Sequence, residues 1–281
     1  GYAMFAMSVA RRWLPGAVVA AVVALSTLPA TAEPARITFL HFNDVYEISP
    51  RDGIGGLAEL MTLVRAERAR HPDSITTFGG DLISPSVLSS VTKGKAMIDL
   101  MNAIGVDVAV LGNHEFDFGP AVAAQRIGES RFPWLGANVL GRDGRPAVGA
   151  RDIVTLRRAG LTVGFFGVLT PDAEAHSSPG RDIEFADVLE TAEASVSRLK
   201  AAGADVVVAL THLSIDQDRD LAASVAGIDL ILGGHDHDPV TFHEGGVLIH
   251  KSGHDAHFLG AIDLMVEPGD QAAKTPRRVR P

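Results

Sequence analysis

Apolar positions along the chain alternate between short continuous runs and helical spacing. Runs of strand length predict strands at residues 36–43, 75–78, 106–111, 134–137, 153–156, 162–168, 206–210, 228–232, 247–250 and 258–266. Apolar residues three or four positions apart predict helices over residues 54–70, 95–103 and 185–201, and Pro120 suits the first turn of a fourth helix. Strands that alternate with helices indicate an α/β fold. The nearly continuous apolar runs indicate strands that are buried on both faces.

The first 32 residues have the pattern of an export signal. Arg11 and Arg12 precede an apolar stretch, residues 17–25, and residues 29–32 read Pro-Ala-Thr-Ala. A basic start, a short apolar core and small residues before the cleavage point predict a signal peptide over residues 1–32. The apolar core is too short to cross about 30 Å of hydrocarbon, although an uncleaved anchor is the alternative. We therefore expect a periplasmic or secreted protein with no membrane contact after cleavage.

The composition narrows the class of protein further. The chain has 281 residues, of which 46% are hydrophobic, and this argues against intrinsic disorder as the overall class. The net charge of −9 argues against a general nucleic-acid binder, because phosphate backbones need a basic face. There is no cysteine, which excludes disulfides, thiolate zinc sites, iron–sulfur clusters and cysteine nucleophiles.

Polar residues gather where five of the predicted strands end. They are Asp44 with Tyr46, Asp81 after Gly80, Asn113 with His114, His212 after Thr211, and His235 with His237. In open α/β sheets, ligands bind outside the carboxyl ends of the strands, so these loops should converge. Oxygen and imidazole ligands without thiolate suit Mn, Zn, Fe or Co. Each motif alone has a structural explanation, such as an Asp that caps a turn, but five strand ends in order favour a metal site.

These residues carry a resemblance to a known family. The motifs Asp44-x-Tyr46, Gly79-Gly80-Asp81, Gly112-Asn113-His114-Glu115-Phe116-Asp117, Thr211-His212 and Gly234-His235-Asp236-His237 resemble those of calcineurin-like metallophosphoesterases, and of the 5'-nucleotidase family among them. The resemblance extends from Ile37 to about Val266, so we expect one catalytic domain over residues 33–267. It implies a four-layer αββα sandwich, in which two mixed sheets are flanked by helices. It also implies a small-molecule phosphate ester as substrate, with a nucleotide preferred.

The resemblance also implies a site for two divalent metal ions, which could be Mn, Zn, Fe or Co. The implied ligands of the first ion are Asp44, Asp81 and His237, and those of the second are Asp81, Asn113, His212 and His235. In the family, the shared carboxylate and a hydroxide bridge the ions. Two ions about 3.5–4 Å apart can generate the nucleophile and clamp the phosphoryl oxygens.

The catalytic pair of the family falls on His114 and Asp117. His114 would stabilise charge on the transferring phosphoryl group and protonate the leaving oxygen. Asp117 would orient the imidazole and raise its pKa. The competing interpretation makes Asp117 only a cap for the helix that begins near Pro120.

The chain departs from the family pattern in two places. The family usually has His at the position of Tyr46, and a phenol with a pKa near 10 is a poor ligand for a divalent ion. Tyr46 could bind a ferric ion as phenolate, water could replace it, or His254 or His257 could compensate; we favour water. The second departure is length. The family has a C-terminal domain that holds the nucleoside, so residues 268–281 are expected to be a tail or the start of a linker to such a domain.

The expected function is therefore that of an exported, 5'-nucleotidase-like phosphoesterase. A 2',3'-cyclic nucleotide phosphodiesterase and a thiosulfohydrolase on the same scaffold are alternatives, because the metals and His114 would serve all of these reactions. A non-catalytic metal-binding module is the alternative from another class, with Tyr46 as its sign.

Overall fold

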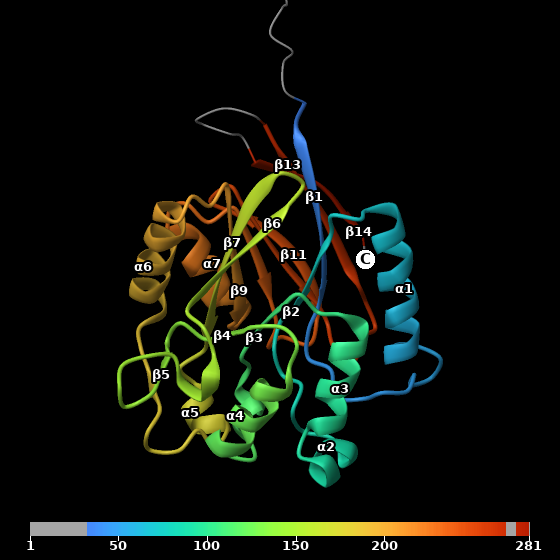
Figure 1. The fold of residues 1–281 in the computed structure, drawn as a ribbon, viewed down its shortest axis with the longest axis vertical. Helices are drawn as coiled ribbons and strands as arrows, with labels where there is room; N and C mark the ends of the chain where they lie inside the picture. Colours follow the sequence, from blue (N-terminus) through green and yellow to red (C-terminus); the bar gives the residue numbers. More distant parts are fainter. Residues whose placement is uncertain (1–32, 268–273, 281) are drawn as a thin grey trace, which may run out of the picture. The chain divides into compact units, whose positions relative to one another are not determined.

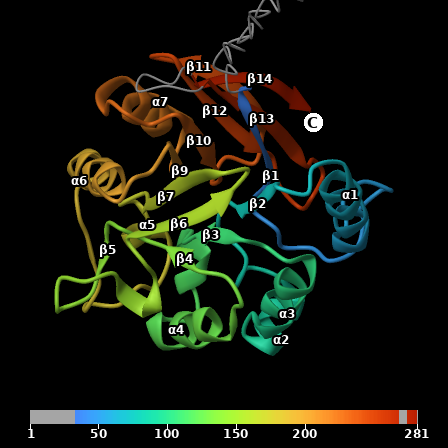
Figure 2. The ribbon, with the colours of Figure 1, turned by 45° about the horizontal axis from the view of Figure 1, so that its top comes forward.

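The computed structural model describes residues 33–267 and 274–280. The expected signal peptide, residues 1–32, and residues 268–273 of the expected tail lie outside the described residues. Within the described part, two six-stranded sheets form the centre of the molecule (Figures 1 and 2).

The first sheet carries the N-terminal half of the site. Its strands, in spatial order, are β14 (Lys274–Arg280), β13 (Gly260–Val266), β1 (Ala35–Phe42), β2 (Ile75–Phe78), β3 (Val108–Val110) and β4 (Trp134–Leu135). Strands β1 to β4 are parallel, and β13 pairs antiparallel with both β1 and β14. Residues Lys274–Arg280, which the sequence analysis left as a tail, thus form the edge strand of this sheet.

The second sheet carries the C-terminal half of the site. Its strands, in spatial order, are β11 (Pro239–Glu244), β12 (Val247–Ser252), β10 (Leu230–Gly233), β9 (Val206–His212), β7 (Leu161–Leu169) and β6 (Ile153–Arg158). Strands β12, β10, β9 and β7 are parallel, and β11 and β6 are antiparallel edges. A separate two-stranded sheet pairs β5 (Val139–Leu140) with β8 (Glu184–Phe185).

Helices cover the outer face of each sheet. Those of the first half are α1 (Leu57–Arg70), α2 (Val87–Thr92), α3 (Lys95–Ile104) and α4 (Pro120–Glu129), with the 3-10 turns η1 (Asn113–Phe116) and η2 (Ala147–Gly149). Those of the second half are α5 (Ala173–His176), α6 (Val188–Ala201) and α7 (Ile215–Ser224). Figure 1 shows α1 to α3 on one side of the molecule and α6 and α7 on the other. None of the described helices is long and apolar enough to span a membrane.

The strands alternate their side chains between two cores. On β1, Phe39 packs into the core between the sheets, and Leu40 packs under α1 and α3. On β9, Val208 faces the first sheet, whereas Val207 packs under α6 and α7. Because both faces of both sheets are buried, the strands read as continuous apolar runs. The expected four-layer αββα sandwich of two mixed sheets is confirmed.

Some element boundaries differ from the sequence expectation for local reasons. Helix α1 begins at Leu57 and not at residue 54, because Gly55 and Gly56 take positive φ of 80° and 99°, outside the helical region. Helix α6 begins at Val188, where the Asp187 side chain accepts from the backbone N–H of Glu190. Helix α7 escaped prediction because its sequence is mostly polar.

Candidate metal centre and active site

The polar residues that follow the strands meet at one end of the two sheets. Asp44, Asp81 and Asn113 follow β1, β2 and β3, which are parallel neighbours. His212 ends β9, and His235 follows its parallel neighbour β10. The expectation that these five loops converge is therefore met by the topology.

Two carboxylates and one imidazole form the centre of this cluster. One ligand atom from each of Asp44, Asp81 and His212 lies within 4.8 Å of the others, and all three residues are buried. His212 Nδ1–H donates to the Gly79 carbonyl at 2.7 Å, so Nε2 is the ring nitrogen that faces Asp81 Oδ2, which is 3.1 Å away. A hydrogen bond of this kind, made by the ring nitrogen that does not face the metal, is how metal-binding histidines are held in one tautomer.

The donor set fits a metal ion. The buried atoms His212 Nε2 and Asn113 Oδ1 have no hydrogen-bond partner in the described structure. Burial disfavours the charged imidazole of His212, but the carboxylates of Asp81 and Asp44 outweigh it and raise its pKa to about 10. Burial alone would raise the pKa of Asp81, but His212 and His114 lower it to about 2. The pocket therefore needs a positive charge, and a bound cation can replace the proton.

The remaining expected ligands surround this centre. His237 Nε2 lies 3.4 Å from Asp44 Oδ1, and its hydrogen bond to Asp44 raises the pKa of His237. The His235 ring lies 5.1 Å from the His212 ring, and burial lowers the pKa of His235, which favours the neutral form that binds metals.

Tyr46 points into the cluster. Its hydroxyl oxygen lies 3.2 Å from Asp44 Oδ1, 3.2 Å from Asp81 Oδ2 and 3.1 Å from His237 Nε2. Burial and the charges of Asp81 and Asp44 raise the pKa of Tyr46 above its usual value. The sequence analysis favoured water in place of this side chain at the metal, which stays a prediction; in the structure the hydroxyl lies among the expected ligands. His254 packs against the ring of His237 at 5.1 Å, and His257 against that of His254 at 4.7 Å.

The expected catalytic pair lies beside the carboxylates. His114 Nδ1 is 2.7 Å from Asp117 Oδ2, and His114 Nε2 is 4.0 Å from Asp81 Oδ2. The His114 side chain is 27% exposed, so a substrate can reach it. Asp117 is not the cap of α4, because the residue at that position is Gly119 and no side chain caps this helix. The arrangement suits proton transfer by an imidazole that a carboxylate orients.

Comparison with known proteins agrees with this geometry. The calcineurin-like phosphoesterase family matches residues 37–239. The chain belongs to this family. The 5'-nucleotidase of Rattus norvegicus is 30% identical over 246 residues, which make up 82% of this chain but 42% of the rat protein. The chain thus spans less than half the length of that relative.

Solved structures share the fold of this chain. The NAD nucleotidase of Haemophilus influenzae superposes with a TM-score of 0.79 at 22% identity, covering 88% of this chain and 50% of that one. The sulfate thiohydrolase SoxB of Thermus thermophilus superposes with a TM-score of 0.75 at 22% identity, covering 87% of this chain and 56% of that one. At this identity, both likenesses show the fold alone.

Left-handed backbone occurs at three of the expected ligands. Asp44, Asp81 and His235 have φ of 51°, 64° and 78°. Non-glycine residues with positive φ are uncommon and cluster at functional sites, where the surroundings hold them. Two contacts that do so are the bond from the His235 N–H to Asp44 Oδ2 at 2.9 Å and the bond from the His114 N–H to Asp81 Oδ1 at 2.8 Å.

Glu115 is a buried residue to which the sequence analysis gave no role. Its two carboxylate oxygens accept the backbone N–H groups of four residues in the loops after β2 and β3, which are Asp81, Leu82, Ile83 and Gly112. Burial and the charge of Asp81 raise the pKa of Glu115 to about 7, although the N–H groups of Leu82, Asp81 and Gly112 oppose that rise. Glu115 therefore joins the loop of Asp81 to the loop of Asn113. The feature of the sequence that could have drawn attention to Glu115 is its position directly after His114.

Lys251 is a second buried residue without a predicted role. Its ammonium group lies 2.6 Å from Asp236 Oδ2 and 2.9 Å from Asp218 Oδ2, and it donates to the carbonyls of Leu213 and Gly234. Leu213 follows His212, and Gly234 precedes His235, so Lys251 ties together the two loops that carry these histidines. A lysine inside the apolar strand β12 is the signal that could have revealed it.

His41 joins the two sheets beneath the site. Its ring lies 2.8 Å from the Gly233 carbonyl on β10 and 2.8 Å from Thr77 Oγ1 on β2. A carbonyl only accepts, so Nε2–H donates to Gly233 and the imidazole is neutral when Nδ1 accepts from Thr77. Burial lowers the pKa of His41 to about 3.

This histidine makes stability depend on pH. Below about pH 6.5 the unfolded chain binds a proton on this imidazole that the folded chain refuses, so the free energy of unfolding falls as the pH drops. We expect His41 to contribute a loss of about 2 kcal/mol between pH 7 and pH 5. Urea unfolding at both pH values, with His41→Gln beside the unchanged chain, measures it. An equal loss in the variant would contradict the assignment.

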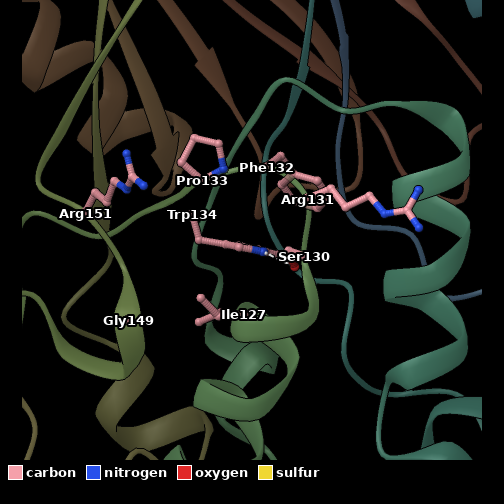
Figure 3. Close-up of a pocket in the computed structure, with 8 residues that line it drawn as sticks. All are labelled: Ile127, Ser130, Arg131, Phe132, Pro133, Trp134, Gly149 and Arg151. Carbon is pink, nitrogen blue, oxygen red and sulfur yellow. Dashed lines mark hydrogen bonds between the residues drawn. The ribbon is translucent and has the colours of Figure 1, made fainter.

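The described surface has several hollows. A groove of about 420 Å³ next to the metal centre is lined by Tyr46, Ile48, Val87, Leu88 and Val91, among others. Another hollow, of about 300 Å³, lies around Trp134, whose indole N–H donates to Ser130 (Figure 3). In this second hollow, Arg131 and Arg151 lie on opposite sides of the tryptophan (Figure 3). None of the expected site residues lines it, so we assign it no part in the reaction.

Proposed function

We propose that this chain is an exported, metal-dependent phosphoesterase that hydrolyses phosphate monoesters of nucleotides. The observation that carries the proposal is the convergence of the buried Asp44, Asp81 and His212 with the pair formed by His114 and Asp117. Membership of the phosphoesterase family and the nucleotidase names of the relatives support the substrate class. The export signal expected over residues 1–32 supports a periplasmic or secreted location.

The ligand atoms can be divided between two divalent ions. Asp44, Asp81 and His237 would hold the first ion, and Asp81, Asn113, His212 and His235 would hold the second. Two divalent ions supply Lewis-acid activation of water and neutralise phosphoryl charge when they are bound. Asp81 suits the shared position because its carboxylate lies between His212 and Tyr46, at 3.1 and 3.2 Å.

The side chains around the metals take the remaining tasks. His114, held in position by its bond to Asp117, would stabilise negative charge on the phosphoryl group and give a proton to the leaving oxygen. Asp117 would keep the Nδ1 side of the ring occupied, so that Nε2 faces the substrate. The groove beside Tyr46 has apolar walls that would suit the apolar part of an ester.

Phosphate release tests the proposal directly. The chain would be incubated with AMP, 2',3'-cyclic AMP and an aryl phosphate, each with Mn, Zn, Co or Fe added. Release from AMP with at least one metal is the expected result, and release from the cyclic ester alone would favour the phosphodiesterase alternative. A folded, metal-loaded chain that releases phosphate from none of them would favour the non-catalytic module.

His114→Ala separates catalysis from metal binding. Because general acid–base catalysis contributes roughly 10²–10⁴-fold, we expect kcat to fall by about that factor. Metal content, measured by mass spectrometry, should stay that of the unchanged chain. His243→Ala is the control, since His243 is exposed on β11. If His114→Ala loses metal together with rate, the role assigned to His114 is wrong.

A further inference from the structure

Helix α2 turns an apolar face to solvent beside the candidate metal centre. Val87 and Val91 are one helical turn apart, so they lie on the same face, and they are 86% and 79% exposed. Leu88, on another side of the helix, packs against the core. Valines this exposed add little to stability, because they leave their apolar surface in water. Packing within the described part of the chain therefore does not explain why both positions are apolar.

The two valines line the groove of about 420 Å³. Ile48, in the loop after β1, adds a further apolar side chain, and Ser49 and Ser86 add hydroxyl groups. Small-molecule sites of about 300–1,000 Å³ typically combine apolar walls with a few polar groups. The groove has the size and the lining of such a site.

Tyr46 joins this groove to the residues of the expected reaction. It lines the groove, and its hydroxyl oxygen lies 3.2 Å from both Asp44 Oδ1 and Asp81 Oδ2. The centre of its ring is 6.0 Å from that of His114. Because His114 is proposed to protonate the leaving oxygen, the group attached to that oxygen would start next to the Tyr46 ring. The groove is therefore within reach of the leaving group.

The lining of the groove favours a neutral ring. Glu47 is the charged residue among those that line it, and its carboxylate would repel a second phosphate or a carboxylate on the leaving group. Apolar walls favour a group that has apolar faces of its own. An aromatic ring meets both requirements, and it buries a large apolar area on a rigid frame.

We propose that this groove binds the aromatic ring of the leaving group, either a nucleobase or an aryl ring, and that Val87 and Val91 set the preference for esters that carry one. The inference rests on the proposed function, since it takes the same phosphoesterase reaction as its setting. It differs from what the family resemblance implies, because that resemblance assigns the nucleoside to a C-terminal domain. Here the phosphoesterase chain itself would hold the ring.

Kinetics with matched esters test this preference. AMP and ribose 5-phosphate share a sugar and a phosphate and differ by the base, and phenyl phosphate carries an aryl ring. In the double variant Val87→Ser/Val91→Ser, kcat/KM should fall at least about tenfold for AMP or phenyl phosphate, because one methylene in a hydrophobic pocket is worth about 10–200-fold. The fall should come from a higher KM, and ribose 5-phosphate should be unaffected.

The pattern of the losses identifies the ring. A fall for AMP alone assigns the groove to a nucleobase, and a fall for phenyl phosphate alone assigns it to an aryl ring. Leu63→Ser is the matched control, since Leu63 is 53% exposed on α1 and does not line the groove. It should leave all three esters unchanged. An equal fall for all three esters in the double variant, or no fall for either ring-bearing ester, would overturn the proposal.

Binding measured without hydrolysis separates this inference from the proposed function. Adenosine, phenol and ribose are each titrated into the full chain, and the valine methyl signals are followed by NMR, with the double variant identifying those of Val87 and Val91. We expect these signals to move with adenosine or phenol and not with ribose. Such shifts in a chain that hydrolyses no ester would support the groove and refute the proposed activity. Phosphate release with no shift and no preference for a ring would leave the phosphoesterase in place and refute the groove.

Discussion

Replacing Asp81 by asparagine is expected to lower kcat/KM by at least about a thousandfold, because the loss of several kcal/mol of charge stabilisation costs tenfold per 1.4 kcal/mol. The side chain is 2% exposed, and its oxygens face His212, Tyr46 and the backbone N–H of His114. An amide has one oxygen in place of two and no charge. It therefore cannot serve two ions and also hold the loop of His114.

Metal content and rate must be measured together for this variant. We expect Asp81→Asn to bind fewer metal ions per chain and to gain less thermal stability when metal is added. Asp99→Asn is the matched control, since Asp99 is an exposed carboxylate that pairs with Lys95 on α3. An Asp81→Asn chain that keeps both its metal content and its rate would remove Asp81 from the centre of the mechanism.

The central strands of this fold could be predicted because they are buried on both faces. The apolar runs at β1, β7 and β9 follow directly from their place between two cores. Helix α7 escaped because its buried contribution is small: Leu221 and Ala222 are its buried apolar residues. The edge strand β14 also escaped, since its proline and its charged residues leave no apolar run in the sequence.

The residues of the candidate site also fall into two groups, those that the sequence predicts and those that it does not. Residues that project from strand ends could be found in the sequence, since strand direction alone brings Asp44, Asp81 and His212 to one edge. Glu115 and Lys251 could not be found in that way. Both act on backbone groups of other loops, and those contacts arise only when the sheets have packed. The sequence therefore predicts the expected ligands better than it predicts the groups that hold the ligand loops.

Lys251→Met is expected to destabilise the protein by about 3–5 kcal/mol, because breaking a buried ion pair leaves uncompensated charge inside. Lys251 and Asp218 are both fully buried, and Asp236 is the second carboxylate of the group. Burial raises the pKa of Asp218 even with the lysine present. Methionine matches the length of the lysine stem but leaves both carboxylates and two backbone carbonyls without their donor.

The control for this prediction is the same substitution at an exposed lysine. Lys95 pairs with Asp99 at 2.7 Å, and both side chains are more than half exposed, so Lys95→Met should cost no more than about 1 kcal/mol. Urea unfolding of the two variants gives the comparison. Adding Asp218→Asn to Lys251→Met should restore part of the loss, because it removes the fully buried carboxylate that the lost lysine leaves unpaired. An equal cost for both lysines would mean that Lys251 is a dispensable cation, and that packing alone holds the loops of His212 and His235 in place.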